Sequence, residues 1–299
     1  MTQPEIEAFL AVIQQGTVTA AAESLYITQP ALSRRLRALE GELGCALFER
    51  GKGSRFAALT REGEAFVAVA DKLRHVYREA REISGLERAP VFSLSSIGSV
   101  STYLLPRVLQ EFVSGPNGYH LSFHLHHSYE AYRHVESGMT DLAIISDDMF
   151  SRETVTTPLF REPFVLACGA DWSGAGPVSP KELDPRREVR LPWNPEFDIW
   201  HGRWFDAAAS PIVCLDQMSL MEEFLTGENF AVVPLTVARR LRRGEIRVFP
   251  LRDGPEDRMI YSVTRPASPR REMMAHFLSL LRRELAGIDG VEPFLGPLP

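Results

Sequence analysis

Leucines recur along residues 29–43 at the spacing of one helix face, at i, i+4, i+7 and i+11: Leu32, Leu36, Leu39 and Leu43. This spacing predicts an amphipathic helix with one apolar side. Off that side lie polar residues that can donate to base edges and phosphates in a major groove: Gln29, Ser33, Arg34 and Arg37. Thr28 is expected to cap the helix, with Pro30 in its first turn, where a missing N–H costs little.

A short Ala-rich helix at about 19–25, with Thr17 or Thr19 as its N-cap, is expected before the turn at Tyr26 and Ile27. An opening helix at 4–15, stopped by Gly16, would pack under it. The three segments together predict a helix-turn-helix. An ordinary amphipathic helix pair with a basic solvated face is the alternative reading of the two later helices.

A longer helix is predicted from its N-cap, Thr60, to about Glu87, before Pro90. Its apolar residues are spaced 3, 4, 3, 4 and 3, which is an a/d seam: Phe66, Val69, Leu73, Val76, Ala80 and Ile83. A second copy of the same helix is the expected cover for this seam, so a dimer is predicted. Burial in the core of its own chain is the alternative.

From Val91 onward, short apolar runs alternate with amphipathic segments. Strands are predicted at 91–96, 121–125, 142–145, 164–168, 212–215, 230–233, 246–251 and 260–264. Helices are predicted at 103–113, 129–137, 198–208, 218–225, 235–243 and about 269–286. This alternation favours mostly parallel sheets with helices on both faces.

Charge is distributed unevenly over the 299 residues. The net charge is −6, yet residues 26–61 carry a net +4, where the helix-turn-helix is predicted. Local charge decides phosphate contact. No apolar run approaches the roughly 20 residues of a membrane helix, and no signal peptide is visible, so no membrane partner and a cytoplasmic location are expected.

Over about sixty residues the N-terminal part resembles the LysR-type transcriptional regulators. The residues that carry the resemblance are Phe9, Ala21, Ala22, Leu25, Thr28 to Ser33, Leu36, Leu39, Glu40, Leu43, Gly44, Leu47 to Arg50, Leu59, Thr60 and Gly63. The resemblance implies an all-α winged helix-turn-helix at 1–60 and a linker (dimerisation) helix at 61–89. A two-lobed α/β effector domain like the periplasmic binding proteins would follow at 90–299. Lys52 and Arg55 would stand on the wing and contact DNA.

The effector-domain pattern matches more loosely. Its anchors are Tyr103 to Pro106, Gly138 with Asp141 to Ile144, and Gly227 to Pro234, where Asn229 stands at a position that the family usually gives to glycine. The resemblance implies one lobe at about 91–161 and 265–299, and another at about 162–264. A ligand cleft would lie between them.

Ligands of such folds sit at the carboxyl ends of strands, against helix N-termini whose N–H groups favour anions. Ser99, Ser101 and Ser128 follow the first two strands and match where the family holds a carboxylate or other polar group; simple helix capping is the alternative. In the other lobe, Trp193 and Asn194 follow a predicted strand end. The expected effector is a small molecule, carboxylate or aromatic.

No metal or cofactor site is expected. His120, His124 and His126 alternate along one strand face without accompanying ligands at metal spacing, and Cys45, Cys168 and Cys214 form no motif. No G-x-S-x-G, P-loop, G-x-G-x-x-G or H-E-x-x-H is present. The sequence thus predicts a DNA-binding regulator, dimeric or a dimer of dimers, and not an enzyme. An α/β enzyme or a solute-binding module with an incidental N-terminal helix pair is the alternative.

Overall fold

The computed structural model describes residues 1–49, 58–83, 91–205, 209–241, 244–266 and 268–294. The chain divides into two compact units, one built on Met1–Pro90 and the other on most of Val91–Pro299. Among the described residues no helix is both long and apolar enough to cross a membrane.

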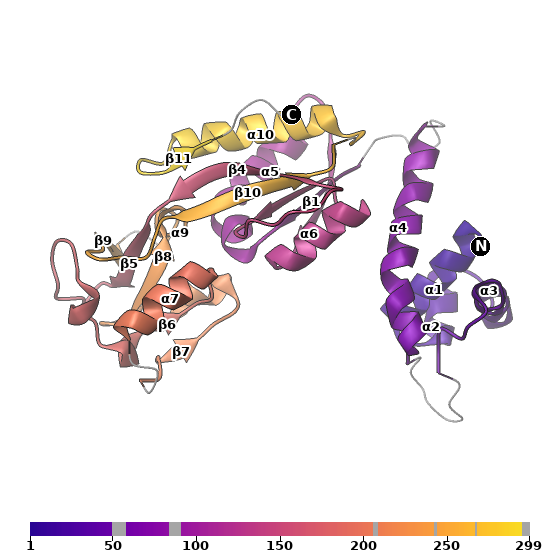
Figure 1. Cartoon of the computed structure of the whole chain (residues 1–299), viewed down its shortest axis with the longest axis horizontal. Helices are drawn as coiled ribbons and strands as arrows, with labels where there is room; N and C mark the ends of the chain where they lie inside the picture. Colours follow the sequence, from indigo (N-terminus) through magenta and orange to yellow (C-terminus); the bar gives the residue numbers. More distant parts are fainter. Residues whose placement is uncertain (50–57, 84–90, 206–208, 242–243, 267, 295–299) are drawn as a thin grey trace. The chain divides into compact units, whose positions relative to one another are not determined.

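The first unit is helical, with its elements labelled in Figure 1: α1 (Gln3–Gln15), α2 (Val18–Ser24), α3 (Gln29–Leu43) and α4 (Arg61–Ile83). Helix α1 packs against the other three. Its Phe9 is fully buried, with ring centroids 5.4 Å from Phe48 and 5.2 Å from Phe66. One aromatic cluster therefore joins α1, the start of α4 and the segment between α3 and α4.

Most of the predicted helix ends are confirmed. Thr17 caps α2, its hydroxyl accepting from the Ala20 N–H at 3.1 Å, and Gly16 ends α1 in the left-handed region with φ 71°. The Thr60 hydroxyl accepts from the Gly63 N–H at 2.9 Å at the start of α4. Thr28 stands at the N-cap of α3 without a side-chain bond.

The leucine face of α3 points into the core for three of its four members. Leu32, Leu36 and Leu39 are buried, whereas Leu43 is 37% exposed. Leu43 was wrongly placed on the buried side. It is the last residue of α3, directly before the left-handed Gly44, and the core ends there.

The base of the predicted wing follows α3. Phe48 pairs with Leu59 in an antiparallel bridge. The Glu40 carboxylate accepts from the Leu47 N–H at 2.8 Å, and so fixes this base to α3.

In the second unit a six-stranded sheet has the order β11-β4-β10-β3-β1-β2. Its strands are β1 (Val91–Ser96), β2 (His120–Leu125), β3 (Leu142–Ile145), β4 (Val155–Glu162), β10 (Arg258–Thr264) and β11 (Glu292–Pro293). Only the β2-β1-β3 part is parallel, while β10, β4 and β11 run antiparallel to their neighbours. The prediction of mostly parallel sheets was therefore wrong, because β4 and β10 join the sheet as returning strands rather than through helical crossovers.

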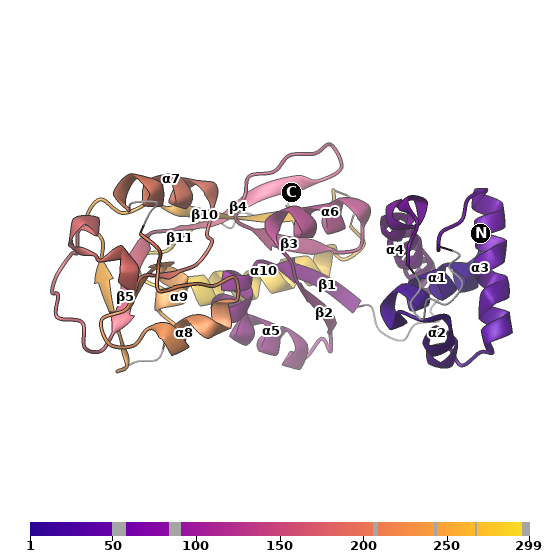
Figure 2. The ribbon, with the colours of Figure 1, turned by 90° about the horizontal axis from the view of Figure 1, so that it is seen from below.

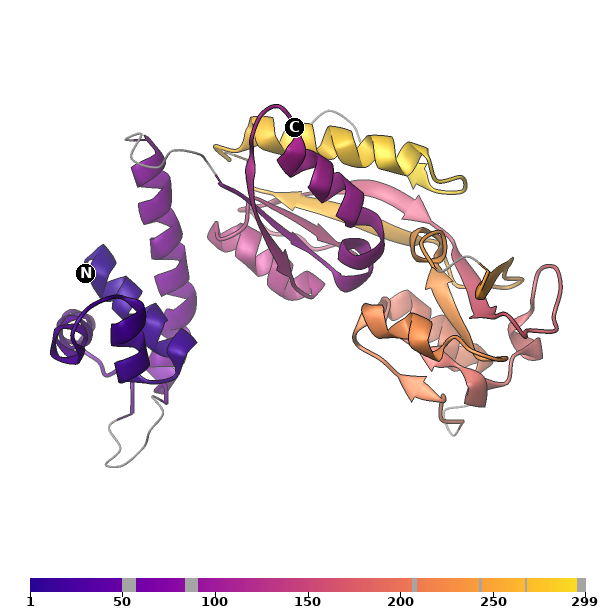
Figure 3. The same cartoon turned by 180° about the vertical axis from the view of Figure 1, so that it is seen from behind.

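Helices cover both faces of this sheet (Figure 2), as α5 (Leu105–Ser114) and α10 (Arg271–Ala286) pack on one face and α6 (Ser128–Ser137) on the other. Along β3 the side chains alternate between the two cores, Leu142 and Ile144 toward α5 and α10, Ala143 and Ile145 toward α6. Figure 3 shows α10 lying beside α5, with which it is in contact.

A smaller antiparallel sheet, β8-β5-β9, and a parallel pair, β6-β7, build the second lobe. Their bounds are β5 (Phe164–Gly169), β6 (Val189–Arg190), β7 (Val213–Cys214), β8 (Phe230–Pro234) and β9 (Ile246–Pro250). Helix α7 (Pro195–Trp204) buries Phe197 and Trp200 against this sheet. The short helices are α8 (Met221–Phe224) and α9 (Leu235–Ala238), with η1 (Val100–Leu104), η2 (Pro180–Glu182), η3 (Pro185–Arg187) and η4 (Met218–Leu220).

The chain returns from the second lobe to the first earlier in the sequence than predicted. Strand β10 begins at Arg258 and pairs with β3 and β4, so 258–264 belongs to the first lobe and the predicted boundary near 264 was wrong. Strand β4 was not predicted, because the segment TVTTPLF is largely polar and is interrupted by Pro158. Helix α9 ends at Ala238, well short of the predicted 243.

Asn229, at the position that the family usually gives to glycine, does not need a left-handed backbone. Its amide donates to the Phe224 carbonyl at 3.1 Å. The side chain is thus turned toward α8.

Gly63→Ala should destabilise the first unit. A Cβ on Gly63 would lie 2.1 Å from the Leu47 carbonyl oxygen, so the wing base or the start of α4 must shift. The expected loss is about 1–3 kcal/mol of unfolding free energy, measured by urea denaturation. Gly41→Ala is the matched control, since a Cβ on Gly41 in α3 meets nothing within 4 Å, and it should be neutral or stabilising. Equal stability of the two variants would contradict this packing.

Candidate functional sites

The polar side of α3 is open to solvent. Of the DNA-contacting residues predicted here, Ser33 is half-buried and the others are exposed. The exposed residues are Thr28, Gln29, Pro30, Arg34 and Arg37. The Arg37 Nε donates to the Ser33 carbonyl at 3.2 Å, which lays this side chain along the helix. Lys52 and Arg55, expected on the wing, lie outside the described residues.

The apolar seam of α4 divides into two parts. Phe66 is only 8% exposed within the core of its own chain, and Leu73 packs partly against that core. Phe66 is therefore no member of an open seam, because it is buried in this core with its ring against Phe9 of α1. Val69 and Val76 are about half exposed, at 48% and 50%, and Ala80 is exposed; the side chain of Ile83 lies outside the described part.

A cavity of about 490 Å³ opens in the second unit, between the first sheet's strand ends and the second lobe. Among the residues predicted to bind an effector, it is lined by Ser99, Ser128 and Trp193. Its volume lies within the range of about 300–1,000 Å³ common to small-molecule sites.

Two predicted residues are engaged elsewhere. The Ser101 hydroxyl donates to the Gly98 carbonyl at 3.0 Å, and the Asn194 side chain caps α7 by accepting from the Phe197 N–H at 3.0 Å. Neither is among the described residues that line the cavity. Helix capping therefore accounts for the Asn194 side chain.

Ser128 is the first residue of α6 rather than its cap. The Ala131 N–H bonds to the His127 carbonyl, one residue before Ser128. The Ser128 hydroxyl instead accepts from the Ser146 N–H at 3.2 Å. This bond ties the start of α6 to the end of β3, and both residues line the cavity.

Arg258, which also lines the cavity, is not among the residues predicted from the sequence. Its side chain is 1% exposed, and its Nη2 lies 2.7 Å from the Glu162 Oε1, itself completely buried. Its Nη1 donates to the Ser99 hydroxyl at 3.0 Å, and its guanidinium lies over the Trp193 ring at 5.6 Å from the centroid. An arginine directly before an apolar run, as in RMIYSV, is the signal that could have found it.

The partner of Arg258 is held from the second lobe. The second oxygen of Glu162 accepts from the Thr236 N–H at 2.7 Å, at the start of α9. Glu162 ends β4 and Arg258 begins β10, and the two residues pair in register. The chain passes from the first lobe to the second directly after Glu162 and returns to the first lobe at Arg258. The ion pair therefore lies at both connections between the lobes.

Tyr103 fixes a second contact between the lobes. It comes from η1 of the first lobe but is buried in the core of the second, where its hydroxyl donates to the Met218 carbonyl at 2.9 Å. Burial, and then the nearby Glu222, raise the pKa of Tyr103. Met218 itself lines the cavity, so this bond helps to shape it.

His126 also lines the cavity. Burial, then His134 and His124, lower its pKa below the ordinary 6.5, against the effect of Glu130. Its Nδ1 is 3.2 Å from the Ser95 hydroxyl. The residue is thus mainly neutral at pH 7. Within the described part of the chain, no group of three or more His, Cys, Asp or Glu is arranged to hold a metal ion.

Cys168 is a buried thiol in β5. Burial raises its pKa to about 12, against the attraction of Arg247. The thiolate is the reactive form of cysteine, so at neutral pH this side chain is a packing residue and not a nucleophile. Cys214 is exposed and Cys45 is half-buried.

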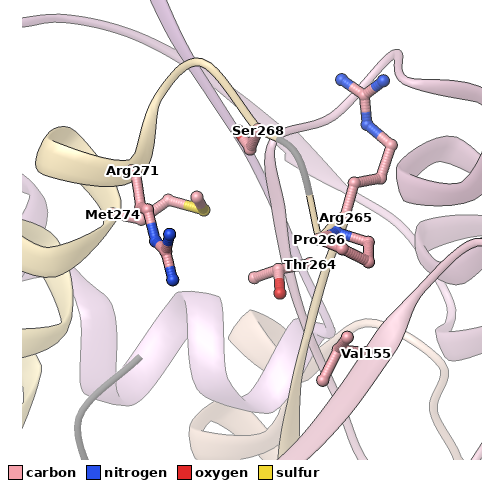
Figure 4. Close-up of a pocket in the computed structure, with 7 residues that line it drawn as sticks. All are labelled: Val155, Thr264, Arg265, Pro266, Ser268, Arg271 and Met274. Atoms are coloured by element: carbon pink, nitrogen blue, oxygen red, sulfur yellow. The ribbon is translucent and has the colours of Figure 1, made fainter. Parts of the chain in front are cut away.

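A second, smaller cavity of about 140 Å³ lies beside the start of α10 in the first lobe. Figure 4 shows its lining, with the Arg271 side chain extending from α10 toward Thr264 while the Arg265 guanidinium points away. None of the described residues that line it carries a carboxylate.

Two family models match the chain. Residues 4–64 match the bacterial regulatory helix-turn-helix protein, lysR family, and residues 87–286 match the LysR substrate binding domain. The chain is 26% identical over 296 residues to a hydrogen peroxide-inducible genes activator of Pectobacterium carotovorum, covering 95% of this chain and 96% of that protein.

Solved structures share the fold. A full-length OxyR variant from Pseudomonas aeruginosa superposes with a TM-score of 0.67 at 23% identity, covering 94% of this chain and 95% of that one. Full-length CbnR complexed with its target DNA gives a TM-score of 0.67 at 21% identity, covering 95% and 100%.

Arg258→Met should strongly destabilise the second unit, because it leaves the Glu162 carboxylate buried without its cation. The expected loss is about 3–5 kcal/mol, and most of it should return in the double variant Arg258→Met with Glu162→Gln. Urea unfolding followed by tryptophan fluorescence measures it. Arg283→Met, which breaks an exposed pair with Glu111, is the control and should change stability little. A single Arg258 variant as stable as that control would refute the role of the pair.

Proposed function

The chain belongs to the LysR family of bacterial transcriptional regulators, and from this premise we propose how it reads DNA and senses its signal. It reads duplex DNA with the exposed side of α3 and responds to a small molecule in the 490 Å³ cavity of the second unit. The protein is a regulator and not an enzyme.

The geometry of α3 supports the DNA contacts. Its leucine side is buried, while Gln29, Arg34 and Arg37 stand on the opposite, exposed side. Arginine pairs with guanine and phosphate, and glutamine with adenine. The N-terminal residues of a recognition helix are the ones that reach the base edges, which favours Gln29, Pro30 and Ser33 for readout and Arg37 for the backbone.

Wing residues complete the proposed contact. Lys52 and Arg55 are assigned to phosphates or the minor groove on the basis of the family resemblance. The wing base at Leu47–Glu49 and Ala58–Thr60 supports this, because Glu40 fixes it to the recognition helix.

A dimer built on α4 is proposed for the exposed part of the seam. Val69, Val76 and Ala80 lie within about 40° of one another around the helix, given 100° per residue. Apolar side chains exposed along one stripe favour a partner helix. Two recognition helices related by a two-fold axis would read half-sites about one helical turn apart. A dimer of dimers would extend this arrangement.

The Glu162–Arg258 pair is the observation that supports ligand sensing most directly. It bridges both connections between the lobes and also forms part of the cavity wall through Arg258, Ser99 and Trp193. A ligand that binds one arrangement of the lobes more tightly shifts the population toward that arrangement. The coupling free energy between ligand and operator is typically about 1–3 kcal/mol. Because the protein acts on DNA, its proposed location is the cytoplasm.

Replacing Arg34 and Ser33 together by alanine should abolish specific operator binding. Each lost base or phosphate contact weakens binding by about 1–3 kcal/mol, and wild-type affinity should fall steeply with salt through counterion release. Fluorescence anisotropy with operator and random duplexes over a salt series measures both effects. Arg252→Ala, an exposed arginine of the second unit, is the control and should keep full affinity. Unchanged binding by the double variant, or a flat salt dependence, would exclude this face of α3.

Val69→Glu with Val76→Glu should dissociate the dimer, because two carboxylates would face their copies across an apolar seam. Sedimentation velocity at micromolar protein is expected to show a monomer. Arg74→Gln, which changes the charge in the same direction on the other side of α4, serves as the control and should remain dimeric. A dimeric double variant would show that α4 does not form the interface.

A further inference from the structure

We infer that the ligand of the 490 Å³ cavity is an organic cation, an amine carried on an apolar or aromatic body. This inference rests on the proposed function, which makes the cavity the effector site. The N-terminus of α6 near Ser128 would by itself suggest a ligand with a carboxylate instead.

Acidic side chains dominate the charge of the cavity. Its described lining includes three carboxylates, Glu130, Asp147 and Asp216, and one arginine, Arg258. The Arg258 charge is already matched by Glu162, with Nε and Nη2 at 3.2 and 2.7 Å from the same carboxylate oxygen. Three negative charges are therefore left without a cation in the lining.

The histidine at the wall does not restore the balance. His126 is mainly neutral at pH 7, since burial and its histidine neighbours lower its pKa. His127, the other histidine of the lining, is exposed. An ammonium group would be attracted by the carboxylates at short range, and a carboxylate repelled.

Nor does the N-terminus of α6 favour an anion here. The dipole of a helix leaves about half a positive charge at its start, but Glu130 stands in the first turn of α6 and offsets it. The positive end of this helix dipole is thus already offset within the chain.

Tyr261, which lies outside the lining, also has carboxylates near it. Burial raises its pKa, and the carboxylates of Asp148, Glu196 and Asp147 raise it further. These residues come from both lobes, Glu196 from α7 and the two aspartates from the loop after β3. Carboxylates of both lobes, and not one side chain alone, therefore contribute to the negative potential at Tyr261.

Apolar groups supply the rest of the wall: Ile97, Leu125, Tyr129, Trp193 and Met218. Leu125 and Tyr129 are 64% and 66% exposed in this state, and a ligand body would cover them. Apolar walls with a few charged groups fit an amphipathic ligand. The smaller cavity has the opposite character, with the Arg271 guanidinium and no described carboxylate (Figure 4).

The test compares three probes of one skeleton: phenylpropylamine, phenylpropanol and phenylpropanoate. Their binding to the full-length protein is measured by isothermal titration calorimetry at pH 7 and low salt. The amine should bind about tenfold or more tightly than the acid, with the alcohol between them. In Asp147→Asn with Glu130→Gln, the amine should lose about five- to tenfold in affinity while the alcohol stays within about twofold. Asp171→Asn, an exposed carboxylate after β5, is the control and should leave all three unchanged.

Several outcomes would overturn the inference. They are equal binding of the three probes, no binding of the amine at millimolar concentration, and tighter acid binding that persists in Arg271→Ala. Acid binding that is lost in Arg271→Ala belongs to the smaller cavity and leaves the inference standing. If the amine binds as expected but does not change operator affinity, the cation class stands and the proposed function fails. If the acid binds in the larger cavity and changes operator affinity, the proposed function stands and the cation class fails.

Discussion

The ion pair between Glu162 and Arg258 is the constraint on which the second unit depends. Both side chains are buried, so each charge needs the other. The pair joins β4 to β10 where the chain passes between the lobes, and Thr236 holds it from the second lobe. A well-packed apolar pair could stabilise the same place. A buried ion pair additionally fixes the relative position of the segments that carry Glu162, Arg258, Thr236 and Ser99 through directed hydrogen bonds, and it does so at the wall of the 490 Å³ cavity.

The first unit follows a different principle, the exclusion of water from a small aromatic and aliphatic core. Phe9, Phe48 and Phe66 meet at its centre. This burial leaves the polar side of α3 exposed as a rigid surface. The same core also buries Phe66, which would otherwise extend the exposed apolar seam of α4. One helix thus serves both the DNA-reading unit, through its first turns, and the proposed dimer, through Val69 and Val76.

Similarity to a hydrogen peroxide-inducible genes activator shows the family of this chain and not the signal to which it responds. Cys168 lies in β5 with its pKa raised to about 12, and the cavity combines carboxylates, rings and aliphatic side chains. The same lobed fold can respond to chemically different signals because the effector contacts only a small set of side chains at strand ends. In this chain the described lining of the 490 Å³ cavity includes three carboxylates.

The amino-acid sequence by itself determined the helices of the first unit, most strands of the second and the exposed side of α3. Each of these depends on local periodicity or a local cap, such as Thr17 and Thr60. Sequence also placed Ser99, Ser128 and Trp193 at the cavity, since strand ends converge in such folds. Only the tertiary structure decided the antiparallel course of β4 and β10, the burial of Phe66 and the pairing of Glu162 with Arg258. Glu162 and Arg258 lie 96 positions apart in the sequence. No local sequence pattern therefore indicates which distant charge pairs with a buried arginine.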